Sequence, residues 1–251
     1  MSEPKYLIPD WPAPTSVKAA VSTRAGGLSS TPYDGFNLAM HVGDQPFSVD
    51  SNRERLCDAL QIESVCWLNQ IHGVKSVQID ANFDFSEAPE ADASWTELKN
   101  VACAVLTADC LPILACNTEG TKVAAIHAGW RGLSNGVIAR CLSAANLVVG
   151  ETLIWFGPAI GPRAYQVGEE VREYFRQSPH FQKFDVDEAF IPDGDTHYLT
   201  DLYELAQMQL RSQGYKNIWG GGECTYSQKD RYFSYRRDGQ TGRMASLIWI
   251  S

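Results

Sequence analysis

Short apolar runs bounded by turn residues recur along the chain and predict β-strands. The predicted strands cover 17–24, 65–73, 101–108, 112–117, 121–129, 152–158 and a C-terminal pair, 232–237 and 243–250, which the DGQTG segment joins as a hairpin. Helical spacing of apolar residues predicts helices over 48–61, 133–148 and 200–214, the last ended by Gly214. Several strands adjoin in sequence and the helices fall unevenly between them, so the pattern favours an α+β fold with mixed sheets over strict βαβ alternation.

Composition indicates one globular domain over residues 1–251. The chain is 44% hydrophobic, which suffices for a sizeable core. It contains no solenoid repeat, long charge block or low-complexity linker. The net charge of -9 disfavours a nucleic-acid surface, because phosphate backbones need clustered Lys and Arg. We therefore expect no nucleic-acid partner and a small metabolite as the ligand.

Targeting signals are not visible in the sequence. The N-terminal segment 1–14 lacks a basic region followed by an apolar one, and no apolar stretch approaches the roughly 18 residues that span a bilayer. We expect a cytoplasmic protein without membrane contact. The seven cysteines form an odd set without CxxC spacing, which predicts buried thiols rather than a disulfide framework.

Three reactive side chains lie at the ends of predicted strands. His72 ends the run CWLNQIHG, His127 ends KVAAIHAG, and Cys110 follows ACAVLTAD. A sheet that delivers all three to one pocket could form a catalytic zinc site with three protein ligands and one open position. Two alternatives stay open: Cys110 as a nucleophile with His127 as its base, or a buried thiol beside hydrogen-bonded histidines. Asp109 faces away from Cys110 in a regular strand, so it contributes only where the strand has already ended.

The segment HAGWRGLSNG joins a predicted strand to a predicted helix. Its backbone amides and the Arg131 guanidinium lie close in sequence to His127, and together they could hold an anion. The alternative is an ordinary turn in which Trp130 belongs to the core and Arg131 is a surface charge.

A set of ordered motifs along nearly the whole chain resembles one family. The motifs are STRAGGLS, FNLAMHVGD, NRERL, NQIHGV, ADASWT, LTADCLPIL, HAGWRG, GPAIGP, CTY and FSYRRDGQTGRMASLIWI. They are similar to those of the YfiH family, also described as laccase-like or multicopper polyphenol oxidase domains and as purine nucleoside phosphorylases. The resemblance implies a layered α/β sandwich similar to the cytotoxic necrotizing factor catalytic domain and the YfiH-like cysteine hydrolase fold.

The resemblance also implies a chemistry. It implies a zinc ion held by His72, Cys110 and His127, all of which are present. The implied reaction is phosphorolysis of adenosine, inosine and S-methyl-5'-thioadenosine to a free base and a ribose 1-phosphate, with adenosine deamination as a side activity. The expected partners are thus a nucleoside and phosphate.

Phosphorolysis requires an anion pocket, and arginine suits it because a planar guanidinium grips phosphate in a bidentate manner. Arg24 ranks first among the candidates, and the others are Arg131, Arg236, Arg237 and Arg243. In a hairpin strand Arg236 and Arg237 face opposite sides, which would make one of them a surface charge. Asn37 and His41 are candidate polar substrate contacts. Asp109 is a candidate for proton transfer or for orienting a metal ligand.

Other functions remain open at this level. Copper is the alternative metal, yet the five histidines are too few for a multicopper laccase, and a single blue-copper centre would need Met40 as its axial ligand. The H-x-E and P-C-x-x-C signature of zinc base deaminases is absent from the sequence. A hydrolase that edits mis-made peptidoglycan precursors and a non-catalytic binding protein complete the alternatives.

Overall fold

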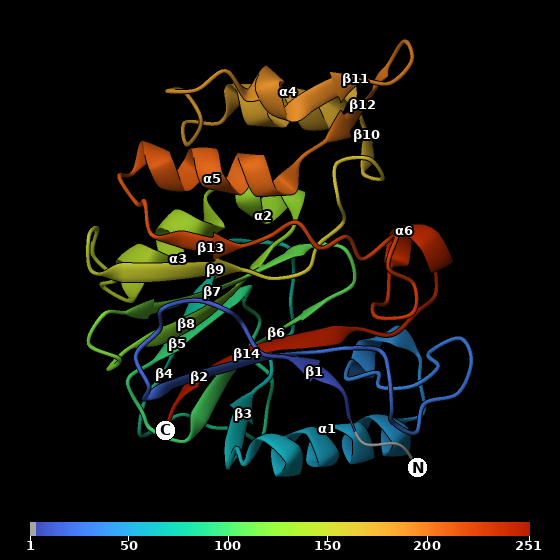
Figure 1. The fold of residues 1–251 in the computed structure, drawn as a ribbon, viewed down its shortest axis with the longest axis vertical. Coiled ribbons are helices and arrows are strands. Elements are labelled where there is room, and N and C mark those ends of the chain that lie inside the picture. The colour runs from blue at the N-terminus through green and yellow to red at the C-terminus, as the bar shows by residue number, and fades with distance from the viewer. Residues whose placement is uncertain (1–3) are drawn as a thin grey trace.

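The computed structural model describes residues 4–251, which form stacked layers of sheet and helix (Figure 1). A six-stranded sheet lies at the centre of the stack. In spatial order it contains β13 (Ile218–Gly220), β9 (Thr152–Phe156), β7 (Leu111–Asn117), β8 (Val123–Ala128), β5 (Ala93–Thr96) and β4 (Ser76–Ile79). The two outer pairs, β13 with β9 and β4 with β5, are parallel, and the inner pairs are antiparallel.

A five-stranded sheet packs against one face of the central sheet. Its order is β1 (Tyr6–Leu7), β2 (Val17–Ser22), β14 (Met244–Ile250), β6 (Val101–Thr107) and β3 (Ser64–Cys66). Val105 and Ile248 of this sheet share one buried apolar cluster with Leu114 and Ala125 of the central sheet. Helix α1 (Pro46–Leu60) covers the outer face, where Leu56 is buried with residues of β6 and β14. The inner layer of the molecule is therefore a sandwich of two mixed sheets.

Helices cover the other face of the central sheet. They are α2 (Trp130–Ser134), α3 (Val137–Ala144) and α5 (Leu202–Ser212). Ile113 and Ile126 of the sheet meet Leu133, Ile138 and Leu205 of these helices in the largest apolar cluster. Helix α4 (Glu169–Gln177), the 3-10 helix η2 (Val186–Ala189) and a small sheet of β10 (Gln166–Gly168), β12 (His197–Thr200) and β11 (Phe190–Pro192) form the outermost layer at the top of Figure 1. The predicted class, α+β with mixed sheets in layers, is confirmed.

Local signals explain the helix ends. The Asp201 carboxylate accepts hydrogen bonds from the backbone amides of Tyr203 and Glu204, which caps α5, and the helix ends shortly before Gly214 as predicted. The single helix predicted over 133–148 is instead two, α2 and α3. Gly136 separates them with a φ of 85°, a left-handed conformation that interrupts a helix.

The predicted C-terminal hairpin is wrong. Residues 235–238 form the short helix α6 (Tyr235–Asp238), whose Ser234 cap accepts a hydrogen bond from the Arg237 amide. Strand β14 pairs instead with β2 and β6, which come from distant parts of the chain. The DGQTG segment is a turn-forming signal, but strand partners are chosen by the buried faces that meet, which local sequence does not encode.

The predicted strand 65–73 is also too long, because β3 ends at Cys66. Beyond it, the Gln70 side chain takes over hydrogen bonding at the edge of β6. Its Nε2 donates to the Leu106 carbonyl oxygen at 2.9 Å, and its Oε1 accepts from the Leu106 amide at 2.7 Å. The backbone of 67–73 is thereby free to leave the sheet. No helix in the described part of the chain combines the length and apolar character required to cross a membrane.

Candidate metal centre and active site

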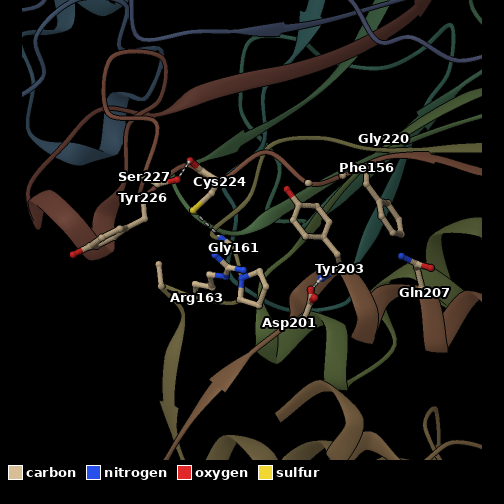
Figure 2. A pocket seen from close by; sticks show the side chains of 14 residues that line it. Phe156, Gly161, Arg163, Asp201, Tyr203, Gln207, Gly220, Cys224, Tyr226 and Ser227 are labelled. Atoms are coloured by element: carbon tan, nitrogen blue, oxygen red, sulfur yellow. Dashed lines mark hydrogen bonds between the residues drawn. The ribbon is translucent and has the colours of Figure 1, made fainter. Parts of the chain in front are cut away.

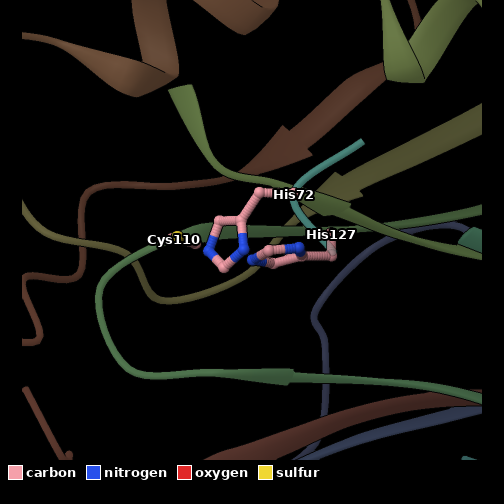
Figure 3. Close-up of side chains that lie close together, drawn as sticks. All are labelled: His72, Cys110 and His127. Atoms are coloured by element: carbon pink, nitrogen blue, oxygen red, sulfur yellow. The ribbon is translucent and has the colours of Figure 1, made fainter. Parts of the chain in front are cut away.

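Three segments that are far apart in the sequence bring His72, Cys110 and His127 together (Figure 3). One ligand atom from each residue lies within 4.8 Å of the others. His72 lies on the loop after β3, Cys110 on the bend between β6 and β7, and His127 in β8. The two imidazole rings stand nearly perpendicular, at 83°, with centroids 4.8 Å apart. The geometry places the three residues named from the sequence in one group that suits a single metal ion.

The loop carrying His72 adopts an uncommon backbone conformation. His72 has a φ of 56°, in the left-handed region that is uncommon for residues other than glycine. The Asp92 carboxylate holds it there by accepting hydrogen bonds from the amides of His72, at 2.9 Å, and Gly73, at 2.6 Å. The sequence indicates a strand that ends in histidine, whereas the imidazole is presented by a loop anchored on a buried acid.

Asp92 also orients His127. His127 Nδ1 donates to Asp92 Oδ1 at 2.8 Å, and the His127 amide donates to the Asp92 carbonyl oxygen at 2.7 Å. With Nδ1 occupied, Nε2 is the nitrogen available to a ligand. Sequence reasoning missed Asp92 as a functional residue. The sequence feature that could have revealed Asp92 is its place in the ADASWT motif, directly before strand β5.

Charge interactions within the group favour its ionised form. Burial alone would raise the pKa of the Cys110 thiol, but the charge of His127 and hydrogen bonds from both histidines lower it to about 6. Burial would lower the pKa of His127, yet the Cys110 charge and the Asp92 hydrogen bond raise it to about 9. Near neutral pH the metal-free group is thus a thiolate beside an imidazolium, and the thiolate is the form of cysteine that binds metals and attacks electrophiles.

A glycine keeps the space around the group open. A Cβ atom at Gly129 would lie 3.1 Å from Cys110 Sγ and 3.1 Å from His72 Cδ2. Both distances are shorter than ordinary van der Waals contact, so a side chain here would displace two of the three donors. The HAGWRG motif therefore serves the site through its first glycine as well as through His127.

Asp109 lies beyond the end of β6 and has a φ of 104°. The strand has thus already ended at Asp109, which is the condition that the sequence analysis set for its contribution to the site. Its carboxylate accepts hydrogen bonds from Thr225 Oγ1 at 2.6 Å and from the Arg236 amide at 2.7 Å. These contacts tie the bend that carries Cys110 to the C-terminal part of the chain. The carboxylate that orients a histidine of the group is Asp92, whereas Asp109 positions the bend.

The predicted substrate contacts divide into two sets, and three of them are linked to the group through its charges or its neighbours in the chain. His41 lies on η1 (Met40–Val42), where partial burial and the charges of Arg243, Arg53 and His72 lower its pKa. The Arg131 guanidinium, two residues after Gly129 in the chain, lies over the Trp130 ring at 4.3 Å. Arg236, whose amide is bound by Asp109, lies over the ring of Tyr165 at 5.2 Å.

Asn37 and Arg24 have other surroundings. Asn37 is fully buried, where its amide donates to Ala39 and Asp44 and accepts from the amides of Ala39 and Arg243. Arg24 lies over Phe233 at 4.9 Å and donates to the Lys229 carbonyl oxygen. It lines a surface hollow whose wall contains none of the three residues of the group. The structure does not bring either residue into contact with His72, Cys110 or His127.

A cavity of about 730 Å³ is lined by residues from the segments 161–164, 201–207 and 220–227 (Figure 2). Phe156, Tyr203 and Tyr226 line it together with Cys224, whose sulfur accepts a hydrogen bond from the Gly161 amide at 3.2 Å. Thr225, the next residue, is the one that donates to Asp109. The sequence pattern did not indicate this cavity, because its walls come from segments that are close only in the folded chain.

Comparison with known proteins identifies the family. Residues 18–251 match the family model described as multi-copper polyphenol oxidoreductase laccase. The chain belongs to this family. One similar solved structure is the crystal structure of a Neisseria meningitidis protein described as DUF152. Its sequence is 44% identical, and the match covers 98% of this chain and 99% of that chain with a TM-score of 0.91. The crystal structure of YfiH from Bacillus licheniformis covers 94% of this chain and 93% of its own, with 28% identity and a TM-score of 0.86.

Family members with curated names carry an enzymatic description. A protein from Pseudomonas aeruginosa named purine nucleoside phosphorylase is 46% identical over 246 residues, covering 98% of each chain. Escherichia coli YfiH, also named purine nucleoside phosphorylase, is 47% identical over 247 residues, covering 98% of this chain and 99% of its own. The resemblance inferred from the sequence motifs is confirmed.

Proposed function

We propose that this protein is a zinc-dependent purine nucleoside phosphorylase acting on adenosine, inosine and S-methyl-5'-thioadenosine. An oxygen of phosphate forms a bond to C1' of the pentose while the bond from C1' to the purine nitrogen breaks, and its electron pair leaves with the base. Adenosine deamination, in which water replaces the amino group and ammonia leaves, is proposed as a side activity. The observation that carries the proposal is the His72, Cys110 and His127 group in a chain similar over its length to relatives named purine nucleoside phosphorylase.

The donor set fits a single zinc ion. Imidazole nitrogen and thiolate sulfur are both zinc donors, and a set of three protein ligands leaves a fourth position for water or substrate. The donors lie within 4.8 Å of one another, Asp92 leaves Nε2 of His127 available, and Gly129 keeps the space free. When bound, zinc would supply Lewis acidity to a substrate or water atom. The same donors bind copper, but five histidines do not suffice for a multicopper centre.

The surrounding residues suit the remaining parts of the reaction. Phosphate is an anion with several acceptor oxygens, and two cations could serve it: Arg236, whose amide donates to Asp109, and Arg131, whose guanidinium lies over the Trp130 ring. Asp109 holds the Cys110 bend through two short hydrogen bonds, so the thiolate keeps a fixed position relative to these cations. Fixed positions matter because phosphorolysis joins two bound substrates in one geometry.

The test is chromatographic detection of hypoxanthine released from inosine, with and without phosphate. The wild type is compared with Cys110→Ala and with Cys57→Ala, a matched control that removes a partly buried thiol from helix α1. We expect base release that needs phosphate, is lost in Cys110→Ala together with the bound metal and is kept in Cys57→Ala.

Other outcomes identify the competing functions. Full phosphorolysis by metal-free Cys110→Ala would exclude the zinc mechanism. Base release without phosphate would indicate a nucleoside hydrolase. No release from any nucleoside would favour the hydrolase of peptidoglycan precursors, and an intense blue colour of the purified protein would favour copper.

A further inference from the structure

The hydroxyl group of Tyr165 has no hydrogen-bond partner within residues 4–251, although the residue is only 9% exposed. The ring packs in the same apolar cluster as Leu111 and Ile160. The hydroxyl oxygen is not among the buried polar atoms that lack a partner in the described part of the chain, so it reaches the protein surface, where it can donate to a bound ligand. Tyr165 is therefore a candidate ligand contact.

The phenol of Tyr165 lies on the Cys110 side of the site. Arg236 connects Tyr165 to the Cys110 bend. Its amide donates to the Asp109 carboxylate, one residue before Cys110, at 2.7 Å, and its guanidinium lies 5.2 Å from the centre of the Tyr165 ring. Arg236 Nη1 also donates to the Gln166 carbonyl oxygen at 2.6 Å, directly after Tyr165 in the chain. The bend of Cys110, the start of β10 and helix α6 thus meet around this ring.

Arg236 lies over the Tyr165 ring, and Arg131 contributes a second positive charge. The charges of Arg236 and Arg131 both act on Tyr165, as do those of Cys110 and Asp109. Burial is the main cause that raises the pKa of the Tyr165 hydroxyl, which accordingly stays protonated and able to donate at neutral pH. Neither arginine forms a salt bridge with a carboxylate in the described part of the chain, and the Asp109 carboxylate is already bound by Thr225 and the Arg236 amide.

This combination suits an oxyanion. Two guanidinium groups that form no ion pair with a carboxylate among residues 4–251, and a hydroxyl donor, match the several acceptor oxygens of phosphate, and guanidinium binds such oxygens in pairs. Arg24, which the sequence analysis ranked first for this role, instead lines a hollow in which three carboxylates, of Asp34, Asp230 and Asp238, balance the charges of Arg24, Lys229 and Arg237.

We propose that Tyr165, Arg131 and Arg236 form the phosphate subsite beside Cys110, with the Tyr165 hydroxyl donating a hydrogen bond to a phosphate oxygen. The assignment of phosphate as co-substrate rests on the proposed function. The subsite places the nucleophilic phosphate on the side of the group where β10 and α6 meet, which leaves the side of His41 and His72 for the nucleoside.

The test uses the metal-containing protein as purified and the variant Tyr165→Phe, which removes one oxygen and keeps the ring under Arg236. We expect the KM for phosphate to rise at least about tenfold, while the KM for inosine changes less than about twofold. Arg236→Ala should raise the KM for phosphate further, and Arg236→Lys should recover part of the loss. The control is Tyr6→Phe, which removes a hydroxyl on β1 at the edge of the five-stranded sheet.

A second measurement separates this inference from the proposed function. Titration calorimetry with inorganic phosphate reports binding whether or not turnover occurs. If the wild type shows no phosphorolysis, the proposed function fails, but weaker phosphate binding by Tyr165→Phe than by the wild type still supports the subsite. Equal phosphate affinity of the two proteins, or an equal rise of both KM values, would overturn the subsite.

Discussion

The Asp92 carboxylate binds His127 Nδ1 at 2.8 Å and, at the same time, the backbone amide of His72 at 2.9 Å. One fully buried acid therefore sets both the ring orientation of one histidine and the backbone conformation of the other. Carboxylates that hold metal-binding histidines in this way tune metal affinity without touching the metal. The relationship makes Asp92 as important for the site as the three donors.

Asp92→Asn should weaken metal binding about 10- to 100-fold. The amide retains the shape of the carboxylate but has only one acceptor oxygen, so it cannot serve His127, His72 and Gly73 together. Competition with a chromophoric zinc chelator measures the affinity. Asp84→Asn, in an exposed loop, is the control and should leave it unchanged. Unaltered zinc affinity in Asp92→Asn would show that the histidines are oriented without it.

Metal affinity should increase with pH in the neutral range. The pKa of Cys110 is lowered to about 6 and that of His127 is raised to about 9, so between these values the metal-free group holds its proton on His127. Zinc must displace this proton, and each pH unit between about 7 and 8.5 should therefore strengthen binding about tenfold, with a plateau above about pH 9. Below about pH 6 the slope should steepen as Cys110 also becomes protonated. Chelator competition across this range tests the slope, and a constant affinity would contradict the thiolate and imidazolium pair.

Gly129→Ala should impair metal binding by crowding. Its methyl group would lie 3.1 Å from both Cys110 Sγ and His72 Cδ2, and the donors must move apart to admit it. We expect at least about a tenfold loss of zinc affinity, which corresponds to ~1.4 kcal/mol. Gly161→Ala is a matched control, because its methyl group would lie at the same 3.1 Å from the sulfur of Cys224. If both variants lose zinc equally, general destabilisation rather than crowding of the donors is responsible.

Arg237→Ala should lower the free energy of unfolding by about 2 kcal/mol. The guanidinium donates to the carbonyl oxygens of Thr225, Tyr226 and Tyr232, and it pairs with Asp238. These bonds hold the C-terminal loop segments that no sheet stabilises. Denaturant unfolding measures the change, with Arg211→Ala on the exposed side of α5 as a control that should cost under about 0.5 kcal/mol. Equal stability of the two variants would show that the loop is held by other contacts.

Local patterning predicts much of this protein, and the reasons are visible in particular elements. Strands β6, β7 and β8 are nearly continuous apolar runs buried on both faces, so short-range hydrophobicity suffices to find them. Cys110 and His127 were conspicuous because they interrupt such runs. The α+β class with mixed sheets followed from the order of the elements, whereas the layered arrangement was implied by the family resemblance. His72 was singled out because it ends a predicted strand, as His127 does.

Only the tertiary structure determined which strands pair and which side chains contact one another. The segment 232–237 carries a strand-like pattern, yet β14 pairs with β2 and β6 because their apolar faces complete the sheet sandwich. Asp92 and Tyr165 gained their roles from neighbours that lie tens of residues away in sequence, at His127 and Arg236. Backbone conformation and apolar periodicity are properties of short segments, whereas hydrogen-bond partners and charge environments depend on chain crossings, which only the folded protein defines.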